Sequence, residues 1–131
     1  MEKSKILLVD DEHIIRQVLT RSLSSAGFSV VTAVNGLEAL ERLKDSSFDA
    51  MITDSMMPIM DGISLLLESR EKYPNMPVLI ITGFSKDLSL GKAKELGACD
   101  LLAKPFKNQE LILSVRRAII SSKRSAQKIK S

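Results

Sequence analysis

The sequence lacks the features typical of secreted, membrane-spanning and nucleotide-binding proteins. Cys99 is the only cysteine, so an internal disulfide is excluded, and with it the disulfide-stapled class of secreted domain. No apolar run approaches the roughly 18 residues that a membrane span needs, and the first four residues do not resemble a signal peptide. No glycine-rich nucleotide-binding motif is present. We therefore expect a cytoplasmic protein with no membrane contact, in which Cys99 is an inert, partly buried thiol.

Charge is distributed unevenly along the 131 residues. Nineteen Lys and Arg against sixteen Asp and Glu give a net charge of +3, which alone would hint at an anionic partner. Six of the basic residues, and no acidic one, lie in residues 116–131, so the other 115 residues hold 13 basic and 16 acidic residues, a net of −3. We expect an acidic domain over residues 1–122, a frayed basic tail or linker stub over residues 123–131, and no nucleic-acid contact by the domain.

Short apolar runs alternate with segments of helical periodicity. The runs are residues 6–9, 29–33, 50–53, 78–81 and 101–103. The first helical segment carries apolar side chains on one face, at Ile14, Ile15, Val18, Leu19 and Leu23. Four further helical segments follow, at residues 36–45, 63–70, 86–96 and about 111–120. Five strand–helix units predict an α/β fold, namely a flavodoxin-like, doubly wound sheet of five parallel strands in the order 2-1-3-4-5.

Polar side chains follow four of the five predicted strands. They are Asp10, Asp11 and Glu12 after the first, Asp54 after the third, Thr82 after the fourth and Lys104 after the fifth. In this strand order the first and third strands are neighbours, so Asp10, Asp11 and Asp54 would converge. Three close carboxylates repel one another unless a cation or protons intervene. An all-oxygen site of this kind suits Mg²⁺ better than a soft metal.

The residue types at this edge suit phosphoryl transfer. A carboxylate beside Mg²⁺ can act as a nucleophile and accept a phosphoryl group, giving an aspartyl phosphate. The metal and a lysine ammonium would offset charge on the transferring group, and a nearby threonine hydroxyl could sense its presence.

Four motifs in order resemble the receiver domains of two-component response regulators. They are ILLVDDE at 6–12, DSMMPIMDG at 54–62, TG at 82–83 and KPF at 104–106, and the resemblance covers about residues 3–120. It implies that Asp54 is the phosphoacceptor and that Asp10, Asp11, Asp54 and the backbone carbonyl of Met56 hold Mg²⁺. It also implies that Thr82 is the switch hydroxyl, that Lys104 contacts the phosphoryl group and that the bond before Pro105 is cis.

The resemblance further implies a signalling phosphoacceptor in a phosphorelay rather than an enzyme. The donor would be a sensor histidine kinase, a histidine phosphotransfer protein or a small acyl phosphate. Output would pass through the face formed by the fourth helix, fifth strand and fifth helix, to a protein partner, a tethered output domain or a homodimer. A stand-alone regulator of the chemotaxis type and a receiver excised from a hybrid kinase or longer regulator both remain open.

Two departures from the family pattern affect output and lifetime. Leu101 occupies the position, three residues before the lysine, where the family usually has a switching aromatic, so that switch cannot operate in its usual form. Met56 and Phe84, two residues after Asp54 and Thr82, cannot orient a water by charge or by a strong hydrogen bond. We therefore expect slow autodephosphorylation.

Two alternatives belong to other functional classes. A flavodoxin-like cofactor module would need a Ser/Thr/Gly-rich phosphate loop after the first strand, where this chain has Asp10, Asp11 and Glu12. An aspartyl-nucleophile phosphohydrolase usually has a second acid two residues after its nucleophile at the end of the first strand. Here Asp10 is followed by Asp11, Glu12 and His13.

Overall fold

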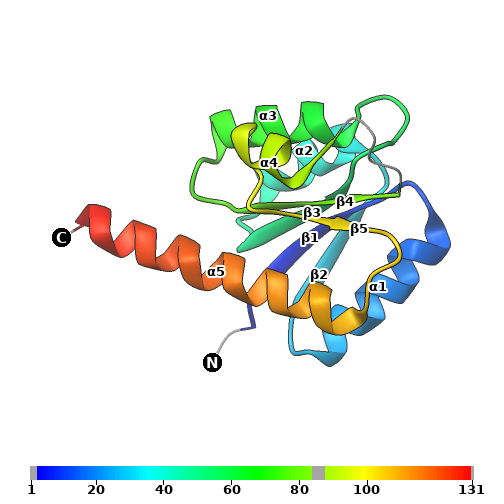
Figure 1. Cartoon of the computed structure of the whole chain (residues 1–131), viewed down its shortest axis with the longest axis horizontal. Coiled ribbons are helices and arrows are strands. Elements are labelled where there is room, and N and C mark those ends of the chain that lie inside the picture. Colours follow the sequence, from blue (N-terminus) through cyan, green and yellow to red (C-terminus); the bar gives the residue numbers. More distant parts are fainter. Residues whose placement is uncertain (1–2, 84–87, 131) are drawn as a thin grey trace.

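A single parallel sheet forms the centre of the molecule (Figure 1). The computed structural model describes residues 3–83 and 88–130, with side chains described up to residue 125. The sheet order is β2-β1-β3-β4-β5 and every pairing is parallel, so the predicted fold is confirmed. The strands are β1 (Lys5–Val9), β2 (Ser29–Ala33), β3 (Ala50–Asp54), β4 (Val78–Thr82) and β5 (Asp100–Ala103).

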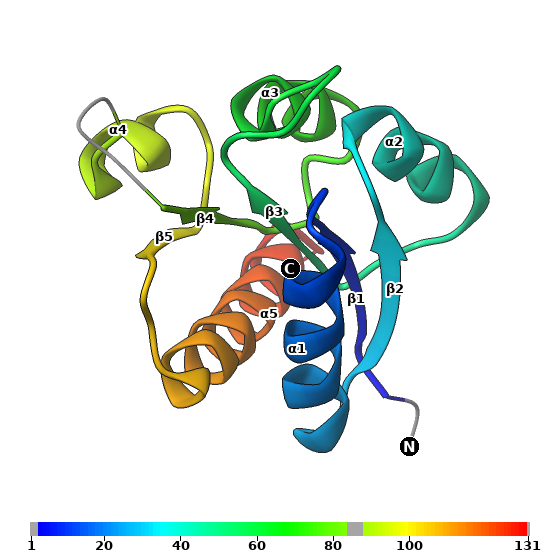
Figure 2. The same ribbon diagram turned by 90° about the vertical axis from the view of Figure 1, so that its right-hand side faces the viewer.

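Five helices cover the two faces of this sheet (Figure 2). They are α1 (His13–Ser25), α2 (Gly36–Asp45), α3 (Gly62–Lys72), α4 (Leu90–Glu95) and α5 (Asn108–Lys130). α1 and α5 pack on one face, and α2, α3 and α4 pack on the other. No described helix combines the length and the apolarity that crossing a membrane requires.

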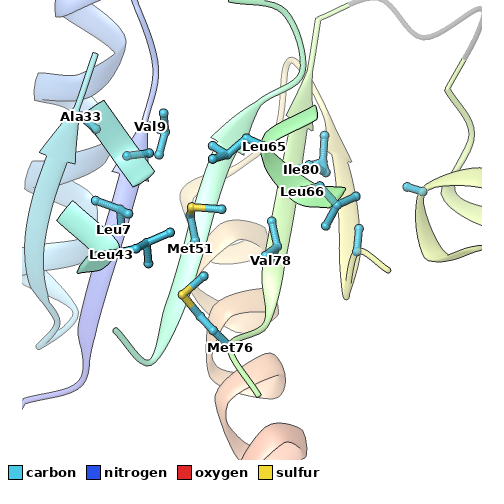
Figure 3. Close-up of a cluster of buried hydrophobic side chains, with 13 residues drawn as sticks. Leu7, Val9, Ala33, Leu43, Met51, Leu65, Leu66, Met76, Val78 and Ile80 are labelled. Carbon is cyan, nitrogen blue, oxygen red and sulfur yellow. The ribbon is translucent and has the colours of Figure 1, made fainter. Parts of the chain in front are cut away.

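Covering both faces explains why the central strands are apolar at consecutive positions. Side chains of β1, β3 and β4 alternate between two buried clusters. Figure 3 shows Leu7, Met51 and Val78 of one cluster, contributed by these three neighbouring strands. Burial of each such side chain contributes roughly 1.5–3 kcal/mol to folding. The framework that carries the strand ends is therefore rigid.

Two helix boundaries differ from those predicted. We expected the fourth helix to begin at about residue 86, but α4 begins at Leu90 because Ser89 caps it, its hydroxyl accepting a hydrogen bond from the Lys92 amide at 3.1 Å. Residues 86 and 87 lie outside the described residues. The helical backbone of α5 continues to Lys130, through the segment expected to be a frayed tail, and the domain boundary at residue 122 stays a prediction.

The predicted apolar face of α1 was too broad. Leu19 and Leu23 are buried, but Ile14 and Val18 are 70% and 51% exposed. The sheet faces only one side of this helix, so the prediction that all five apolar side chains share a buried face is wrong for these two residues.

Candidate functional site

Asp10, Asp11 and Asp54 converge at the edge of the sheet where the strands end. Val9 pairs with Thr53 in the register of β1 and β3, so the residues that follow each of them lie side by side. One carboxylate oxygen of each aspartate lies within 4.8 Å of one from each of the others. Asp10 and Asp54 are buried, whereas Asp11 is exposed. The predicted convergence of the three carboxylates is confirmed.

Backbone contacts fix Asp10 in place. Its amide donates to the Ala33 carbonyl of β2 at 3.1 Å, and its own carbonyl accepts from the Arg16 guanidinium of α1 at 2.8 Å. One carboxylate oxygen accepts a hydrogen bond from the Glu12 amide at 2.9 Å, and the carboxylate also faces those of Asp11 and Asp54. The side chain is therefore held at a set position with an oxygen available to a cation.

Asp54 ends β3 in an equally constrained backbone. The Ser55 amide donates to the Ile81 carbonyl at 2.8 Å, and the Gly62 amide donates to the Ser55 carbonyl at 3.0 Å, closing the loop between β3 and α3. A Cβ on Gly62 would lie 2.1 Å from the Asp54 carbonyl oxygen. Only glycine permits this close approach.

Asp61, the other acid of this loop, has a different task. Its side chain caps α3 by accepting a hydrogen bond from the Ser64 amide at 2.8 Å, and the residue is exposed. It is not part of the described carboxylate cluster. Asp61 is therefore a natural control for the role of Asp54.

Thr82 and Lys104 border the carboxylates from the neighbouring strands. Lys104 Nζ lies 3.9 Å from an Asp54 carboxylate oxygen, and the Lys104 amide donates to the Thr82 carbonyl at 2.8 Å. Thr82 is buried, and the Lys104–Pro105 peptide bond is cis. The structure thus brings the Lys104 ammonium to the three carboxylates and places Thr82 at the end of the strand next to β3.

Burial and repulsion from neighbouring acids raise the pKa values of the Asp10 and Asp54 carboxyls. Desolvation raises the pKa of Asp54 to about 6; the Lys104 ammonium opposes this rise and the charges of Asp10 and Asp11 add to it. Desolvation also raises the pKa of Asp10, against the hydrogen bond from the Glu12 amide. A divalent cation would relieve this desolvated negative charge. The donor set of carboxylate oxygens around an open position fits Mg²⁺.

The raised pKa of Asp54 predicts that Asp54→Asn stabilises the protein by an amount that depends on pH. The folded protein holds the Asp54 proton more tightly than the unfolded chain, so between about pH 6 and the ordinary value of 3.8 the folded state binds more protons and gains stability as pH falls. Above pH 6 the ionised carboxyl destabilises the fold by up to about 3 kcal/mol. In the absence of metal and near pH 7.5, we expect the free energy of unfolding of the variant to be about 1–3 kcal/mol higher than that of the wild type.

Urea unfolding followed by far-ultraviolet circular dichroism measures this difference, since the chain has no tryptophan. The advantage of the variant should shrink as the pH falls from about 6 towards 3.8, and also when Mg²⁺ is added to the wild type. Equal stabilities of the two proteins near pH 7.5 in the absence of divalent cations would contradict this account.

Two other positions singled out from the sequence, Met56 and Leu101, differ in burial. The Met56 side chain is 74% exposed, whereas Leu101 is partly buried against the cluster of apolar side chains under α2, α3 and α4. Phe84 lies outside the described residues. Gly62 and Ser55 were not predicted as site residues. The Asp61-Gly62 pair signals a turn, but nothing in the sequence indicates that the turn packs against the Asp54 carbonyl.

A doubly wound sheet with clustered carboxylates and a lysine at its carboxyl edge can be compared with known proteins. The response regulator receiver domain model matches residues 6–116, and the chain belongs to that family. The chain is 40% identical over 119 residues to the DNA-binding transcriptional regulator NtrC of Escherichia coli K12, covering 91% of this chain and 25% of NtrC. It is 43% identical over 113 residues to the CpxR homolog of Haemophilus influenzae, covering 86% of this chain and 49% of that protein.

Solved structures have the same fold. A receiver domain protein from Clostridium thermocellum matches with a TM-score of 0.86 and 34% identity, covering 92% of this chain and 97% of the other. NtrX from Brucella abortus, in complex with ADP, matches with a TM-score of 0.89 and 32% identity, covering 98% of this chain and 29% of NtrX. The chain thus spans a quarter of NtrC and about half of the CpxR homolog.

Proposed function

We propose that Asp54 is the phosphoacceptor of this receiver domain. The observation that carries the proposal is the position of its carboxylate, buried between Asp10 and Lys104 and 3.9 Å from the Lys104 ammonium. An Asp54 oxygen attacks the phosphorus of a phosphohistidine on a sensor kinase or phosphotransfer protein. The new O–P bond forms as the N–P bond breaks, and the imidazole nitrogen keeps the electron pair of the broken bond and takes up a proton.

The other residues of the site serve this transfer. Asp10, Asp11, Asp54 and the Met56 backbone carbonyl would hold Mg²⁺, which supplies charge neutralisation for the attacking and transferring oxygens. Lys104 offsets negative charge on the phosphoryl oxygens, and the Thr82 hydroxyl donates a hydrogen bond to one of them once it is in place. The domain acts as a signalling phosphoacceptor that promotes its own modification and loses it slowly.

Output follows from the movement of Thr82 toward the phosphoryl group. Thr82 ends β4, and its carbonyl accepts from the Lys104 amide just after β5, so its displacement bears on the face made by α4, β5 and α5. Leu101 has no hydroxyl and no ring, so this face changes without an aromatic rotamer. The proposed partners of the face are a downstream protein, a tethered output domain like those of longer regulators, or a second copy.

Neither alternative function gains support from the site. A flavin phosphate would meet three clustered carboxylates at the end of β1 and β3, where an anion is repelled. Glu12, two residues after Asp10, is exposed and lies outside the described cluster of three carboxylates, which argues against a role as the second acid of an aspartyl-nucleophile phosphohydrolase.

Intact-mass spectrometry with acetyl phosphate tests the proposed function. We expect one added phosphoryl mass in the presence of Mg²⁺ and little or none with a chelator, because the clustered carboxylates need a cation to accept a further anion. After the donor is removed, the added mass should persist for many minutes. Equal labelling with and without the cation, or no labelling with either, contradicts the proposal.

A further inference from the structure

A second concave site lies at the opposite end of the sheet from Asp54. This cleft of about 560 Å³ is bordered by Pro77, just before β4, and by Asp100, the first residue of β5, whereas Asp54 is the last residue of β3. Three cations from three helices line it together with four serine hydroxyls: Arg70 of α3, Lys94 of α4, Arg117 of α5, Ser114, Ser121, Ser122 and Ser125. α3 and α4 lie on one face of the sheet and α5 on the other (Figure 2).

Within the described part of the chain, the positive charge of this cleft is only partly neutralised. The ion pairs there are Arg42–Glu38 and Lys104–Asp54, and neither involves a cleft residue. Asp100 is the one acid among the residues that line the cleft. Its carboxylate oxygens already accept hydrogen bonds from the Leu101 amide at 2.8 Å and the Ser114 hydroxyl at 2.5 Å. Three cations against one acid leave a net positive cleft.

Arg70 is held in position at the cleft wall. Its guanidinium donates to the Met76 carbonyl at 3.2 Å, and its aliphatic stem packs so closely on Gly97 that a Cβ there would lie 3.0 Å from Arg70 Cγ. A guanidinium with one donor occupied retains four N–H groups for a ligand. The ordering entropy of this side chain is therefore already lost before a ligand binds.

The charges of Arg70 and Lys94 both affect the Cys99 thiol in the cleft wall. Burial raises the pKa of the Cys99 thiol to about 11, the Asp100 charge adds to the rise, and the charges of Arg70 and Lys94 oppose it. Both cations are thus within electrostatic reach of the same sulfur atom. At neutral pH the protonated thiol adds no negative charge to the cleft.

We propose that this cleft binds a small molecule that carries two or more phosphate groups. Its volume falls within the range of roughly 300–1,000 Å³ that is usual for small-molecule sites. Guanidinium forks and serine hydroxyls are the donors that recognise phosphate oxygens. The Ser114 and Ser122 hydroxyls already donate to Asp100 and to the Asn75 carbonyl, so the guanidinium groups and the hydroxyls of Ser121 and Ser125 would serve the ligand. Cations on three walls of a concavity suit a compact polyanion better than an extended acidic segment, which needs its positive partners in a row. The proposal stands apart from the role of Asp54.

Isothermal titration calorimetry of the whole chain with sodium pyrophosphate, in metal-free buffer, tests the proposal. The double variant Lys94→Gln with Arg117→Gln removes two exposed cations, so its fold should be retained. The control pairs Arg21→Gln with Lys44→Gln, two exposed cations outside the cleft, and makes the same change in net charge. We expect the cleft variant to bind at least about tenfold more weakly and the control to change by less than about twofold.

Three results would overturn the proposal. No heat of binding up to about 10 mM pyrophosphate would leave the wild type without a site. Equally weakened pyrophosphate binding in both double variants would mean that the net charge of the protein, and not the cleft, determines the affinity. Tighter binding of hexaglutamate than of pyrophosphate would favour an acidic protein segment as the occupant. Circular dichroism of both variants verifies that each is folded.

Discussion

Asp54→Asn is expected to abolish labelling by acetyl phosphate, lowering the rate of phosphoryl incorporation by at least about 100-fold. The amide is neutral and is a far poorer nucleophile than the carboxylate, although it has nearly the same shape. It also removes one of the three carboxylates that would hold the cation. The loss of labelling should accompany the gain in stability argued above, so it cannot be explained by unfolding.

Asp61→Asn is the matched control for this experiment. It changes an acid of the same loop by the same atom replacement, but Asp61 is exposed and caps α3. Asn is itself a good cap, so both the fold and the labelling should be retained. Labelling that survives in Asp54→Asn, or disappears in Asp61→Asn, would refute the assignment of the acceptor.

Gly62→Ala is expected to destabilise the protein by about 3 kcal/mol or more, a large effect for one added methyl group. The new Cβ would lie 2.1 Å from the Asp54 carbonyl oxygen and 2.9 Å from Ser55 Cα, and both contacts are with backbone that cannot rotate away. Relief requires moving the loop and breaking the 3.0 Å hydrogen bond from the Gly62 amide to the Ser55 carbonyl. Urea unfolding followed by circular dichroism measures the loss.

Gly91→Ala provides the comparison. Gly91 lies in α4, and an added Cβ would lie 3.9 Å from the Ser89 hydroxyl oxygen, an ordinary contact. A helical glycine replaced by alanine should gain roughly 0.5–1 kcal/mol. A Gly62→Ala variant as stable as the wild type would mean that the loop is not packed against Asp54 as described.

The sequence predicts the strands and the strand-end residues because both depend on local patterns. Continuous apolar runs such as residues 78–81 require cover on both faces, and parallel strands bring their ends to one edge. Strand order then makes Asp10 and Asp54 neighbours. These inferences need no knowledge of how individual side chains pack.

Features that depend on packing were not predictable in the same way. Ile14 and Val18 fit an apolar helical face, yet they are exposed because the sheet contacts only one side of α1. The start of α4 is set by the Ser89 cap, which competes with a longer apolar periodicity. The close approach of Gly62 to Asp54 depends on how one loop folds back on itself. The gathering of Arg70, Lys94 and Arg117 joins residues that are far apart in the sequence.

Chemical mapping of the modified residue tests the central claim most directly. Borohydride reduces an aspartyl phosphate to homoserine, so treating the labelled protein, digesting it and sequencing the peptides by mass spectrometry identifies the carboxyl that carried the phosphoryl group. We predict homoserine at position 54 and unmodified aspartate at positions 10, 11 and 61. Homoserine at any of those three positions, with Asp54 intact, would contradict the account.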